Sequence, residues 1–338
     1  MSGKNNIFTI SERTGYSVST VSRVLSGKAE KYRISQAAVE RITREADRCN
    51  YRPNLVAQSL RTQKSQTIGL LVPGIENPFF ATLAGIVIEL LGARGYHTLL
   101  ADSGEAEAEE REALRMFQSR SVDGIICVPV SASPALHEEV GRQTPMVLLD
   151  RYFRETSLSY VCTDNYAGAR MATEYLLEKG YRHILAIQGV PASMPNQERV
   201  RGFLSAVKEA GATCSVAGDA FSVDNGYRET LQAFGSGGAR SFDAVFAFSS
   251  TILLGTIQAL RTLQLRPARD VGVISFDNNG FLDFLDPAVT RVEQPLREAG
   301  SLAVETLFTL MDARREGLPE PPPLHQLIKP TLAIRSSC

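Results

Sequence analysis

The segment from residue 17 to residue 25 combines small, hydroxyl-bearing and cationic side chains at helical spacing. On a helix that begins at Val18, the side chains of Ser19, Ser22 and Arg23 share the exposed side with Val18. An arginine there can donate to a guanine edge or to a phosphate, and serine hydroxyls can bond phosphates. Small side chains let such a helix enter the major groove of DNA deeply. The chemistry indicates DNA recognition, and the alternative is an ordinary solvated helix face.

A second group of polar and aromatic residues follows apolar runs later in the chain. These stretches are 77–80 (NPFF), Asp150-Arg151, Asp164-Asn165 and 277–279 (DNN). Ligands of open α/β sheets bind outside the carboxyl ends of the strands, where such residues would gather. The pattern therefore predicts a small-molecule site. Asp150 and Asp277 could also act as the acid/base pair of an enzyme, but we favour recognition of ligand hydroxyls.

Three short helices are expected in the first 50 residues. The first carries Ile7 and Ile10 on one face, the second starts after a possible Ser17 cap, and the third starts after Ser35. The turn at 14–16 contains a glycine, which supplies the positive φ of a tight corner, so the first two helices predict a helix-turn-helix. Residues 53–61 would form a further helix of about two turns, which is marginal in isolation. We expect it to order only against DNA or a partner subunit.

The charge is distributed unevenly along the chain. Residues 1–64 contain twelve Lys and Arg and five Asp and Glu, a net charge of +7, whereas the remainder carries −8. A basic head on an acidic body is typical of a nucleic-acid-binding module joined to another function, although a merely basic surface would fit as well. The predicted domains are a helix-turn-helix domain at 1–52, a hinge helix and linker at 53–64, and a body at 65–338.

From residue 67 onward, apolar runs alternate with helical stretches. The runs are continuous, which indicates strands buried on both faces and linked by helices as parallel βαβ units. About 270 residues of this pattern exceed one ordinary sheet. The predicted fold is an all-α head plus an α/β body of two doubly wound parallel-sheet subdomains with a cleft between them. The expected strands are 67–72, 96–101, 124–129, 146–150, 183–188, 244–248 and 271–276.

Several other functions are disfavoured. No apolar run is long enough to span a membrane, and the first residues lack a signal-peptide pattern, so we expect a cytoplasmic protein. The five cysteines and four histidines are scattered without metal-ligand spacing, so neither a metal nor a cofactor is predicted. Dinucleotide, phosphate-loop and nucleophile-elbow motifs are missing, so no catalytic residue is predicted. An exported solute-binding protein is the alternative that the body alone would permit.

The chain resembles the LacI/GalR family of bacterial regulators over essentially its whole length. The matching stretches are 17–25 (SVSTVSRVL), 51–54 (YRPN) with Ala57 and Leu60-Arg61, 68–73 (IGLLVP), 77–80 (NPFF), 122–126 (VDGII), Asp164-Asn165 and 198–203 (ERVRGF). A lone helix-turn-helix is a weak signal, whereas so many motifs in order are specific.

The resemblance implies a homodimer that binds palindromic double-stranded operator DNA at the bacterial nucleoid. It implies a body like the type I periplasmic binding proteins, whose chain would cross between subdomains near Asp164, near Gln294 and within 321–323. The subdomains would then comprise 65–163 with 295–322, and 164–294 with 323–338. Leu60 would be a wedge in a minor-groove base step, with packing against the body as the alternative. The implied DNA-binding residues are Ser17, Val18, Ser19, Thr20, Ser22, Arg23, Asn54, Ala57 and Leu60.

The resemblance also implies a carbohydrate effector that sets operator affinity allosterically. Carboxylates accept hydrogen bonds from hydroxyls, arginine can grip a carboxylate or phosphate oxygen, and aromatic faces cover the C–H side of a sugar. Phe79 could instead be ordinary core, and Asp277 could be a helix cap. The implied effector-binding residues are Asn77, Phe79, Asp150, Arg199, Phe221, Ser249, Asp277 and Gln294.

Two positions depart from the family pattern. Ser249-Ser250 stands where many relatives have Asn-Asp, and Gln197 stands where some carry a second arginine, so no particular sugar specificity can be transferred. The stretches 27–35 and 276–285 look like the fructose-repressor branch. A sugar phosphate is therefore the first choice of effector, and an unphosphorylated sugar is the second.

We expect assembly to stop at the dimer. Some relatives form tetramers through C-terminal leucine heptads, but Pro330 interrupts residues 327–338, which read as a last strand of the body. Dimerisation would then use the surface of the body, for example Leu83, Val87 and Leu90 facing their symmetry mates. The alternative is that these three residues pack only on their own sheet.

Overall fold

The computed structural model describes residues 7–51, 64–235 and 242–338. The chain divides into two compact units, residues 1–65 and 66–338, each with its own hydrophobic core. Within the described ranges, no helix is both long enough and apolar enough to cross a membrane.

The head unit contains three helices, α1 (Ile7–Thr14), α2 (Val18–Leu25) and α3 (Gln36–Arg48). Gly15 has a φ of 74° between α1 and α2, as the tight corner requires. The hydroxyl of Ser17 accepts from the backbone N–H of Thr20, and Ser35 caps α3 in the same way. The helices enclose a small core of Ile10, Val21, Val24, Ile42 and Ala46.

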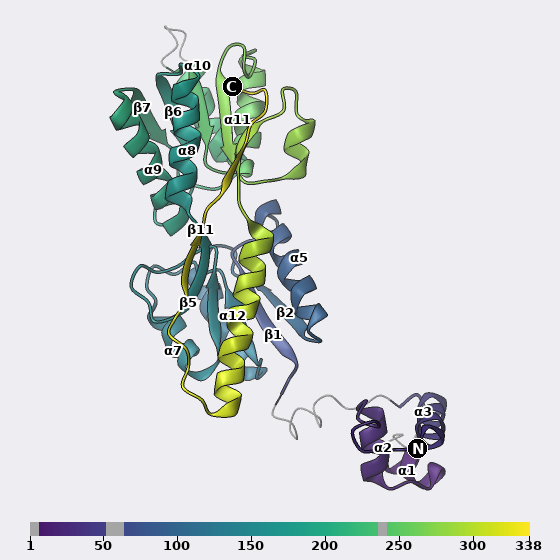
Figure 1. Ribbon diagram of the computed structural model, residues 1–338. Coiled ribbons are helices and arrows are strands. Elements are labelled where there is room, and N and C mark those ends of the chain that lie inside the picture. Colours follow the sequence, from purple (N-terminus) through teal and green to yellow (C-terminus); the bar gives the residue numbers. More distant parts are fainter. Residues whose placement is uncertain (1–6, 52–63, 236–241) are drawn as a thin grey trace. The chain divides into compact units, whose positions relative to one another are not determined.

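The first sheet of the body is parallel throughout, in the strand order β11-β5-β4-β3-β1-β2. Its two faces carry different helices: Leu70 and Val72 of β1 share a core with α5 and α12, whereas Leu71 faces α6. This alternation along one strand is the doubly wound arrangement, and Figure 1 shows α12 and α5 lying together over the sheet. The elements are β1 (Thr67–Val72), α5 (Pro78–Ala93), β2 (His97–Asp102), α6 (Glu107–Ser119), β3 (Gly124–Cys127), α7 (Ala135–Gln143), β4 (Met146–Leu149), β5 (Ser159–Thr163), α12 (Leu296–Glu316) and β11 (His325–Ile328).

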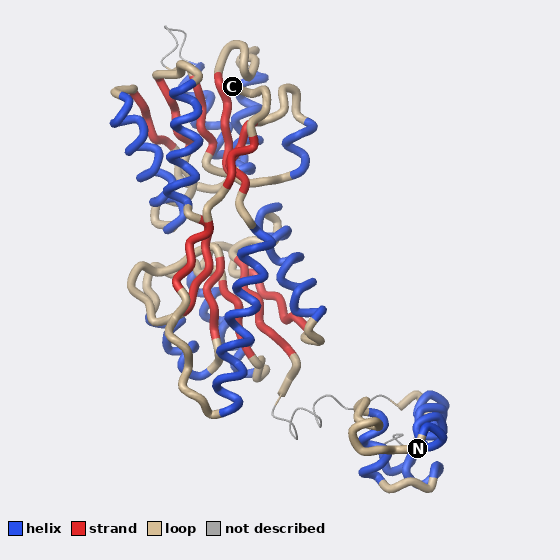
Figure 2. Tube along the Cα trace, in the orientation of Figure 1, coloured by secondary structure: helices blue, strands red, loops and turns tan. Residues whose placement is uncertain are grey.

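The second sheet follows the order β12-β10-β9-β8-β6-β7, and all of its described pairings are parallel except that of β12 with β10. Figure 2 shows the two sheets as separate groups of strands, each flanked by helices. The elements are α8 (Asn165–Glu178), β6 (His183–Ile187), α9 (Met194–Ala210), β7 (Thr213–Ala217), α10 (Val223–Gly235), β8 (Ala244–Ala247), α11 (Ser250–Thr262), β9 (Gly272–Phe276), the 3-10 helix η1 (Gly280–Phe284), β10 (Thr290–Glu293) and β12 (Thr331–Ala333).

The chain passes between the two sheets three times. The first passage follows β5 at Asp164, and the second lies between β10 and α12, at Gln294, both near the expected positions. The third was wrongly expected at 321–323: β11 still pairs with β5 of the first sheet, so the chain crosses only at Lys329 and Pro330. The C-terminal stretch is therefore two strands in different sheets, not one last strand, because Pro330 has no N–H to continue the ladder.

The proposed dimer contacts on α5 need correction. Leu83 and Val87 are 2% and 0% exposed because they pack in the core shared by α5, α12 and the first sheet. They face their own subunit and are not available to a symmetry mate. Ile88, on the outer side of the same helix, is 41% exposed.

Candidate DNA-reading surface and ligand cleft

The second helix of the head presents the residues that sequence analysis assigned to DNA. Ser17, Ser19 and Arg23 are exposed, and Val18, Thr20 and Ser22 are half-buried, whereas Val21 and Val24 on the opposite side are buried. The hydroxyl of Ser17 lies 2.9 Å from those of both Ser19 and Thr20, so the amino end of the helix carries a connected group of hydroxyls. Three further assigned residues, Asn54, Ala57 and Leu60, lie outside the described residues.

Seven of the eight residues assigned to the ligand line one cleft between the two subdomains. They follow the carboxyl ends of strands from both sheets, the place where parallel sheets bind ligands. The cleft is narrow in this structure, with a cavity volume of about 30 Å³. Its lining is Asn77, Phe79, Phe80, Asp150, Arg151, Pro195, Arg199, Phe221, Ser249 and Asp277.

Two buried aspartates face the cleft from equivalent positions, Asp150 after β4 and Asp277 after β9. Both adopt the left-handed conformation, with φ of 65° and 79°, which few residue types other than glycine and asparagine or aspartate tolerate. The Asp277 carboxylate is held by the protein: it accepts from Gln294 Nε2 at 2.7 Å and from the Ser250 backbone N–H at 3.1 Å. Gln294 thus lies behind Asp277 rather than among the lining residues.

The Asp150 carboxylate is different, since no described residue donates a hydrogen bond to it. Burial raises the pKa of Asp150 to about 6, against the opposing effect of Arg151 and Arg199. A buried carboxylate without donors is costly unless a ligand supplies them. The geometry therefore leaves Asp150 ready to accept from ligand hydroxyls.

Arg199 lies at the floor of the cleft and is 4% exposed. Its Nε donates to Asn165 Oδ1 at 2.8 Å, its Nη1 donates to the Phe248 carbonyl, and its guanidinium lies 3.8 Å from the centre of the Phe276 ring. Burial lowers the pKa of Arg199, while the two aspartates oppose that effect. No described residue accepts a hydrogen bond from Arg199 Nη2, so this group can donate to a ligand oxygen.

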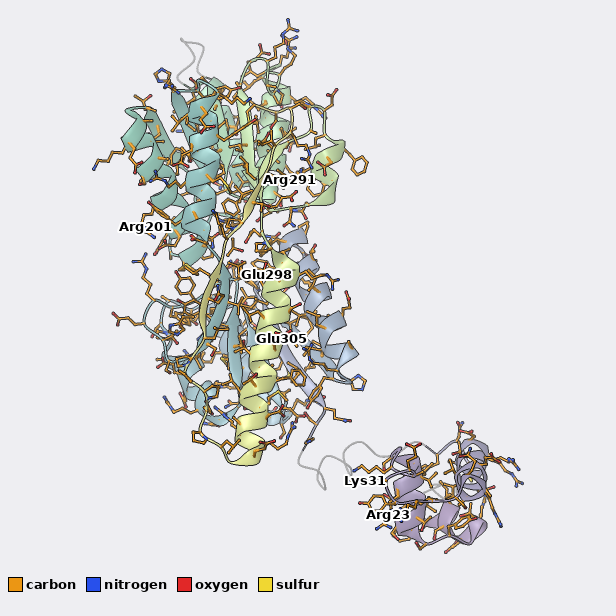
Figure 3. All side chains as sticks on the ribbon, viewed as in Figure 1. Arg23, Lys31, Arg201, Arg291, Glu298 and Glu305 are labelled. Atoms are coloured by element: carbon orange, nitrogen blue, oxygen red, sulfur yellow. The ribbon has the colours of Figure 1, made fainter. Side chains whose placement is uncertain are left out.

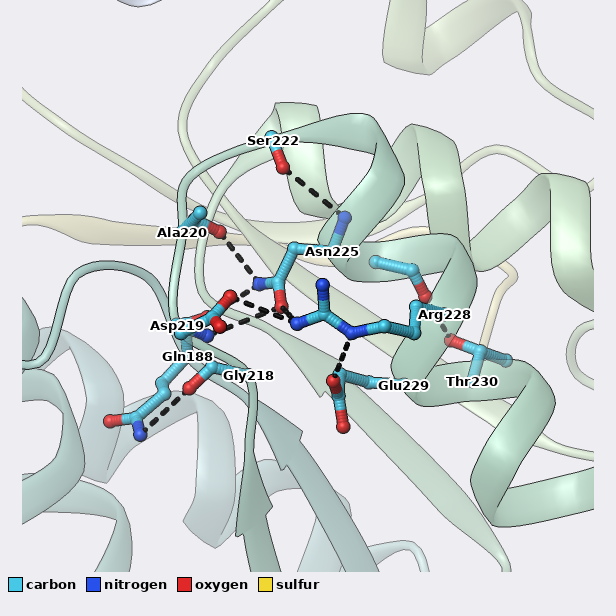
Figure 4. Close-up of polar contacts among 10 residues, drawn as sticks. Gln188, Gly218, Asp219, Ala220, Ser222, Asn225, Arg228, Glu229 and Thr230 are labelled. Carbon is cyan, nitrogen blue, oxygen red and sulfur yellow. Dashed lines mark hydrogen bonds and ion pairs between the residues drawn. The ribbon is translucent and has the colours of Figure 1, made fainter.

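Phe221 owes its position to a polar network in the loop between β7 and α10. The buried Asn225 amide donates to the carbonyls of Gln188 and Ala220, and its oxygen accepts from the Asp219 N–H (Figure 4). The ring then lies so close to Gly189 that a Cβ there would be 2.2 Å from Phe221 Cε1. The loop and Gly189 together fix the position of the Phe221 ring, which forms one wall of the cleft.

The other aromatic wall is built at the amino end of α5. Asn77 caps that helix by accepting from the Phe79 N–H at 3.0 Å, and the rings of Phe79 and Phe80 meet edge to face. Arg151 lies beside Phe80 and makes a two-pronged ion pair with Glu105 at 2.6 and 2.8 Å. Its charge is thereby balanced within the first subdomain.

One group of potential metal ligands occurs among the described residues, Glu110, Cys127 and His137, all fully buried. Both Glu110 oxygens are already used, because they accept from the backbone N–H groups of Val130 and Ser131 and contact His137 Nε2 at 3.1 Å. The group supports the loop at 130–131 through hydrogen bonds. Both Glu110 oxygens are engaged in these contacts and are not free to bind a metal.

Comparison with known proteins decides the family. Residues 7–54 match the bacterial regulatory proteins of the lacI family, and residues 173–338 match a periplasmic binding protein-like domain. The chain is 32% identical over 305 residues to the ribose operon repressor of Halalkalibacterium halodurans, with 90% of each chain covered. The chain belongs to the LacI family.

Solved structures agree with the fold of this LacI-family chain. The lac repressor dimer bound to operator and the anti-inducer ONPF has a TM-score of 0.86 at 21% identity, with 98% of each chain covered. A periplasmic binding protein/LacI regulator from Alkaliphilus metalliredigens, complexed with D-xylulofuranose, has a TM-score of 0.70 at 24% identity and covers 80% of this chain and 98% of its own. The expected fold class and the expectation of a DNA-binding transcriptional regulator are confirmed.

The serine pair that departs from the LacI-family pattern has a structural role in each member. Ser249 caps α11 by accepting from the Ile252 N–H at 3.2 Å, and Ser250 supports Asp277 and accepts from Asn279. Gln197, the other departure, lines a wider cleft that adjoins the first and shares Arg151 with it.

Sequence reasoning did not assign Phe80, Arg151 and Pro195 to the cleft. Phe80 and Arg151 belong to the NPFF and Asp-Arg motifs that marked strand ends, so adjacency to an assigned residue was the available signal. Pro195 is the second residue of α9 and carries no comparable signal.

Proposed function

We propose that this LacI-family regulator binds palindromic operator DNA as a homodimer and that a small sugar or sugar phosphate in the cleft sets its operator affinity. The convergence of Asp150, Arg199 and Asp277 between aromatic walls carries the proposal. Fixed carboxylates accept from ligand hydroxyls, the guanidinium donates to a ligand oxygen, and Phe79 and Phe221 cover C–H faces. The names and complexes of the related proteins, which include ribose and D-xylulofuranose, support a carbohydrate.

The charge of the cleft favours a neutral sugar over the sugar phosphate suggested by the sequence. Asp150 and Asp277 both act on Arg199, and Arg151 is already paired with Glu105. A dianionic phosphate would meet two carboxylates and a single unpaired cation, Arg199, so the field in the cleft disfavours it. The adjoining wider cleft offers room for a phosphate outside this field.

Control of DNA binding follows from where the ligand contacts lie. Asn77, Phe79 and Asp150 belong to the first subdomain, and Arg199, Phe221 and Asp277 belong to the second. A ligand that touches both halves stabilises one orientation of the subdomains. If operator affinity depends on that orientation, ligand binding and operator binding are coupled reciprocally, with a coupling free energy of typically about 1–3 kcal/mol.

The test begins with the DNA. The full chain selects duplexes from a randomised palindromic library, and the selected duplex then reports affinity as D-ribose, D-xylulose, D-fructose and their phosphates are added. We expect affinity to fall steeply with salt, because the basic head displaces counterions, and to change with one sugar class. If the protein selects no sequence, the operator proposal is refuted. If no compound changes the affinity for the selected duplex and none raises the Tm of the protein, the carbohydrate proposal is refuted.

A further inference from the structure

The exposed face of α2 contains an arginine that is stacked on a tyrosine from the following loop. The guanidinium carbon of Arg23 lies 4.0 Å from the centre of the Tyr32 ring. Tyr32 is 45% exposed, so the ring does not serve the core of the head. No described residue forms an ion pair with Arg23, which leaves its N–H groups available.

The loop that carries Tyr32 is itself fixed. Its backbone is closed by bonds from Lys28 N to the Arg23 carbonyl and from Ile34 N to the Ala29 carbonyl, both 2.9 Å. Ala29 and Ile34 are partly buried against the core of the head. The residues on either side of Tyr32 therefore anchor the loop, and the ring is held at a defined distance from α2.

We propose that Tyr32 is a positioning residue for base recognition, holding the Arg23 guanidinium in the plane from which it can donate to a guanine. Stacking uses the face of the guanidinium and leaves its N–H edge free, which is the edge that bonds guanine O6 and N7. An unsupported arginine would lose side-chain freedom on binding, whereas a stacked one has lost much of it beforehand. This inference rests on the proposed DNA-reading role of α2.

The setting of the pair on the head supports this role. Figure 3 shows Arg23 and Lys31 on the same side of the head unit, so the loop that carries Tyr32 adds a second cation on that side. Lys31 precedes Tyr32 in the loop and can contact phosphates without reading sequence. The loop would thus supply both a phosphate contact and a support for the base-reading side chain.

The experiment compares the base preference of four full-length proteins selected against randomised duplex DNA: wild type, Arg23→Ala, Tyr32→Leu and Tyr32→Phe. Arg23→Ala should lose preference at one base pair in each half-site. Tyr32→Leu should weaken preference at that same base pair by about fivefold, and Tyr32→Phe should keep it because the ring face is retained. Lys31→Ala is the matched control, and it should weaken binding equally for all sequences and reduce the salt dependence.

The outcomes separate this inference from the proposed function. If Arg23→Ala selects the wild-type sequence, the reading role of Arg23 fails. If Arg23→Ala changes one base pair but Tyr32→Leu does not, the Tyr32 inference alone is overturned. A uniform loss of affinity in Tyr32→Leu would also overturn it. Tyr32→Gln is a second substitution that removes the ring. If the head unfolds in both Tyr32→Leu and Tyr32→Gln, as measured by circular dichroism, Tyr32 is a structural residue and the inference is overturned.

Discussion

At the scale of single residues, the two aspartates of the cleft differ in how the protein holds them. Asp277 is already bonded to Gln294 and Ser250, so its orientation is fixed before a ligand arrives. Asp150 is buried with no described donor, so its negative charge destabilises the folded protein when no ligand is bound. Under the proposed function, ligand hydroxyls that donate to Asp150 would recover the stability lost there.

Asp150→Asn should therefore stabilise the ligand-free protein in a pH-dependent way. The folded-state pKa of about 6 is above the ordinary 3.8, so the favourable contribution of wild-type Asp150 is complete below pH 3.8 and is lost as the pH rises through 6. At pH 7.5 the variant should be more stable by up to about 3 kcal/mol, and the difference should shrink toward pH 5. Thermal unfolding at both pH values measures it, and a constant difference would contradict the pKa assignment.

At the scale of elements, sequence prediction found the strands that have a continuous apolar run, including the exposed edge strand β2. Strands such as β1 and β9 were predicted because both faces are covered and every position is apolar or small. β7 was missed because it is the edge strand of the second sheet and is half-exposed, so its sequence has no continuous apolar run. β5 and β10 were missed as well, since polar residues interrupt each of them, and half of β11 was merged into the single strand expected at 327–338.

The cleft, too, could be predicted from the sequence only in part. Motifs at strand ends led to Asp150 and Asp277, because position after a strand can be read from the chain itself. The roles of Gly189 and Asn225 depend on contact between β6, β7 and α10, segments that are separated in sequence. No local pattern contains that information, so only the folded structure identifies them.

Gly189→Ala should displace the Phe221 wall. The new Cβ would overlap the Phe221 ring, and the ring must move because the added methyl cannot. The variant should bind the selected duplex with wild-type affinity but lose about tenfold or more in effector affinity, the equivalent of about 1.4 kcal/mol. Titration of effector against the protein–duplex complex measures this. Gly85→Ala, where an added Cβ meets nothing within 4 Å, is the control, and an unchanged effector titration for Gly189→Ala would contradict the placement of Phe221.

At the scale of the whole body, an ion pair between described residues joins the two subdomains across the cleft. Arg154, in the loop after β4, donates to Glu198 of α9 at 2.6 Å, and the buried Glu198 also accepts from Arg201. Glu198 precedes the ligand-cleft residue Arg199 in the chain. Movement of α9 on ligand binding would therefore change the distance between Arg154 and Glu198.

Arg154→Ala should loosen the two subdomains relative to each other. Hydrogen exchange should quicken in the three crossing segments, at 163–165, 293–295 and 328–331, while the sheets keep their protection. The pair should contribute below about 1 kcal/mol because Arg154 is largely exposed, with less effect at high salt. Arg297→Ala is the matched control: its side chain is 63% exposed against 64% for Arg154, but its partner Glu89 lies in the same subdomain. Equal exchange in both variants would contradict a bridging role.

The outer surface of the body offers a test of the dimer. Phe284 in η1 is 90% exposed and Ile88 on α5 is 41% exposed, and Figure 1 shows both helices on the same side of the body. Phe284 is the most exposed large apolar side chain among the described residues, and we propose that it belongs to an apolar interface patch. Light scattering should give about twice the chain mass of 36.9 kDa for wild type and a lower value for Phe284→Asp. A mass of four chains, or an unchanged dimer in the variant, would refute this surface.

The late position of α12 and β11 in the chain has a consequence for synthesis on the ribosome. The first sheet, which begins at Thr67, lacks its covering helix until residue 316 and its edge strand until residue 328 have been made. The head, by contrast, has a complete core once Ala46 has emerged. A nascent or prematurely terminated chain therefore carries a finished DNA-reading module with an unfinished sensor. A chain truncated before residue 316 should therefore have a folded head beside a first sheet that lacks α12 and β11.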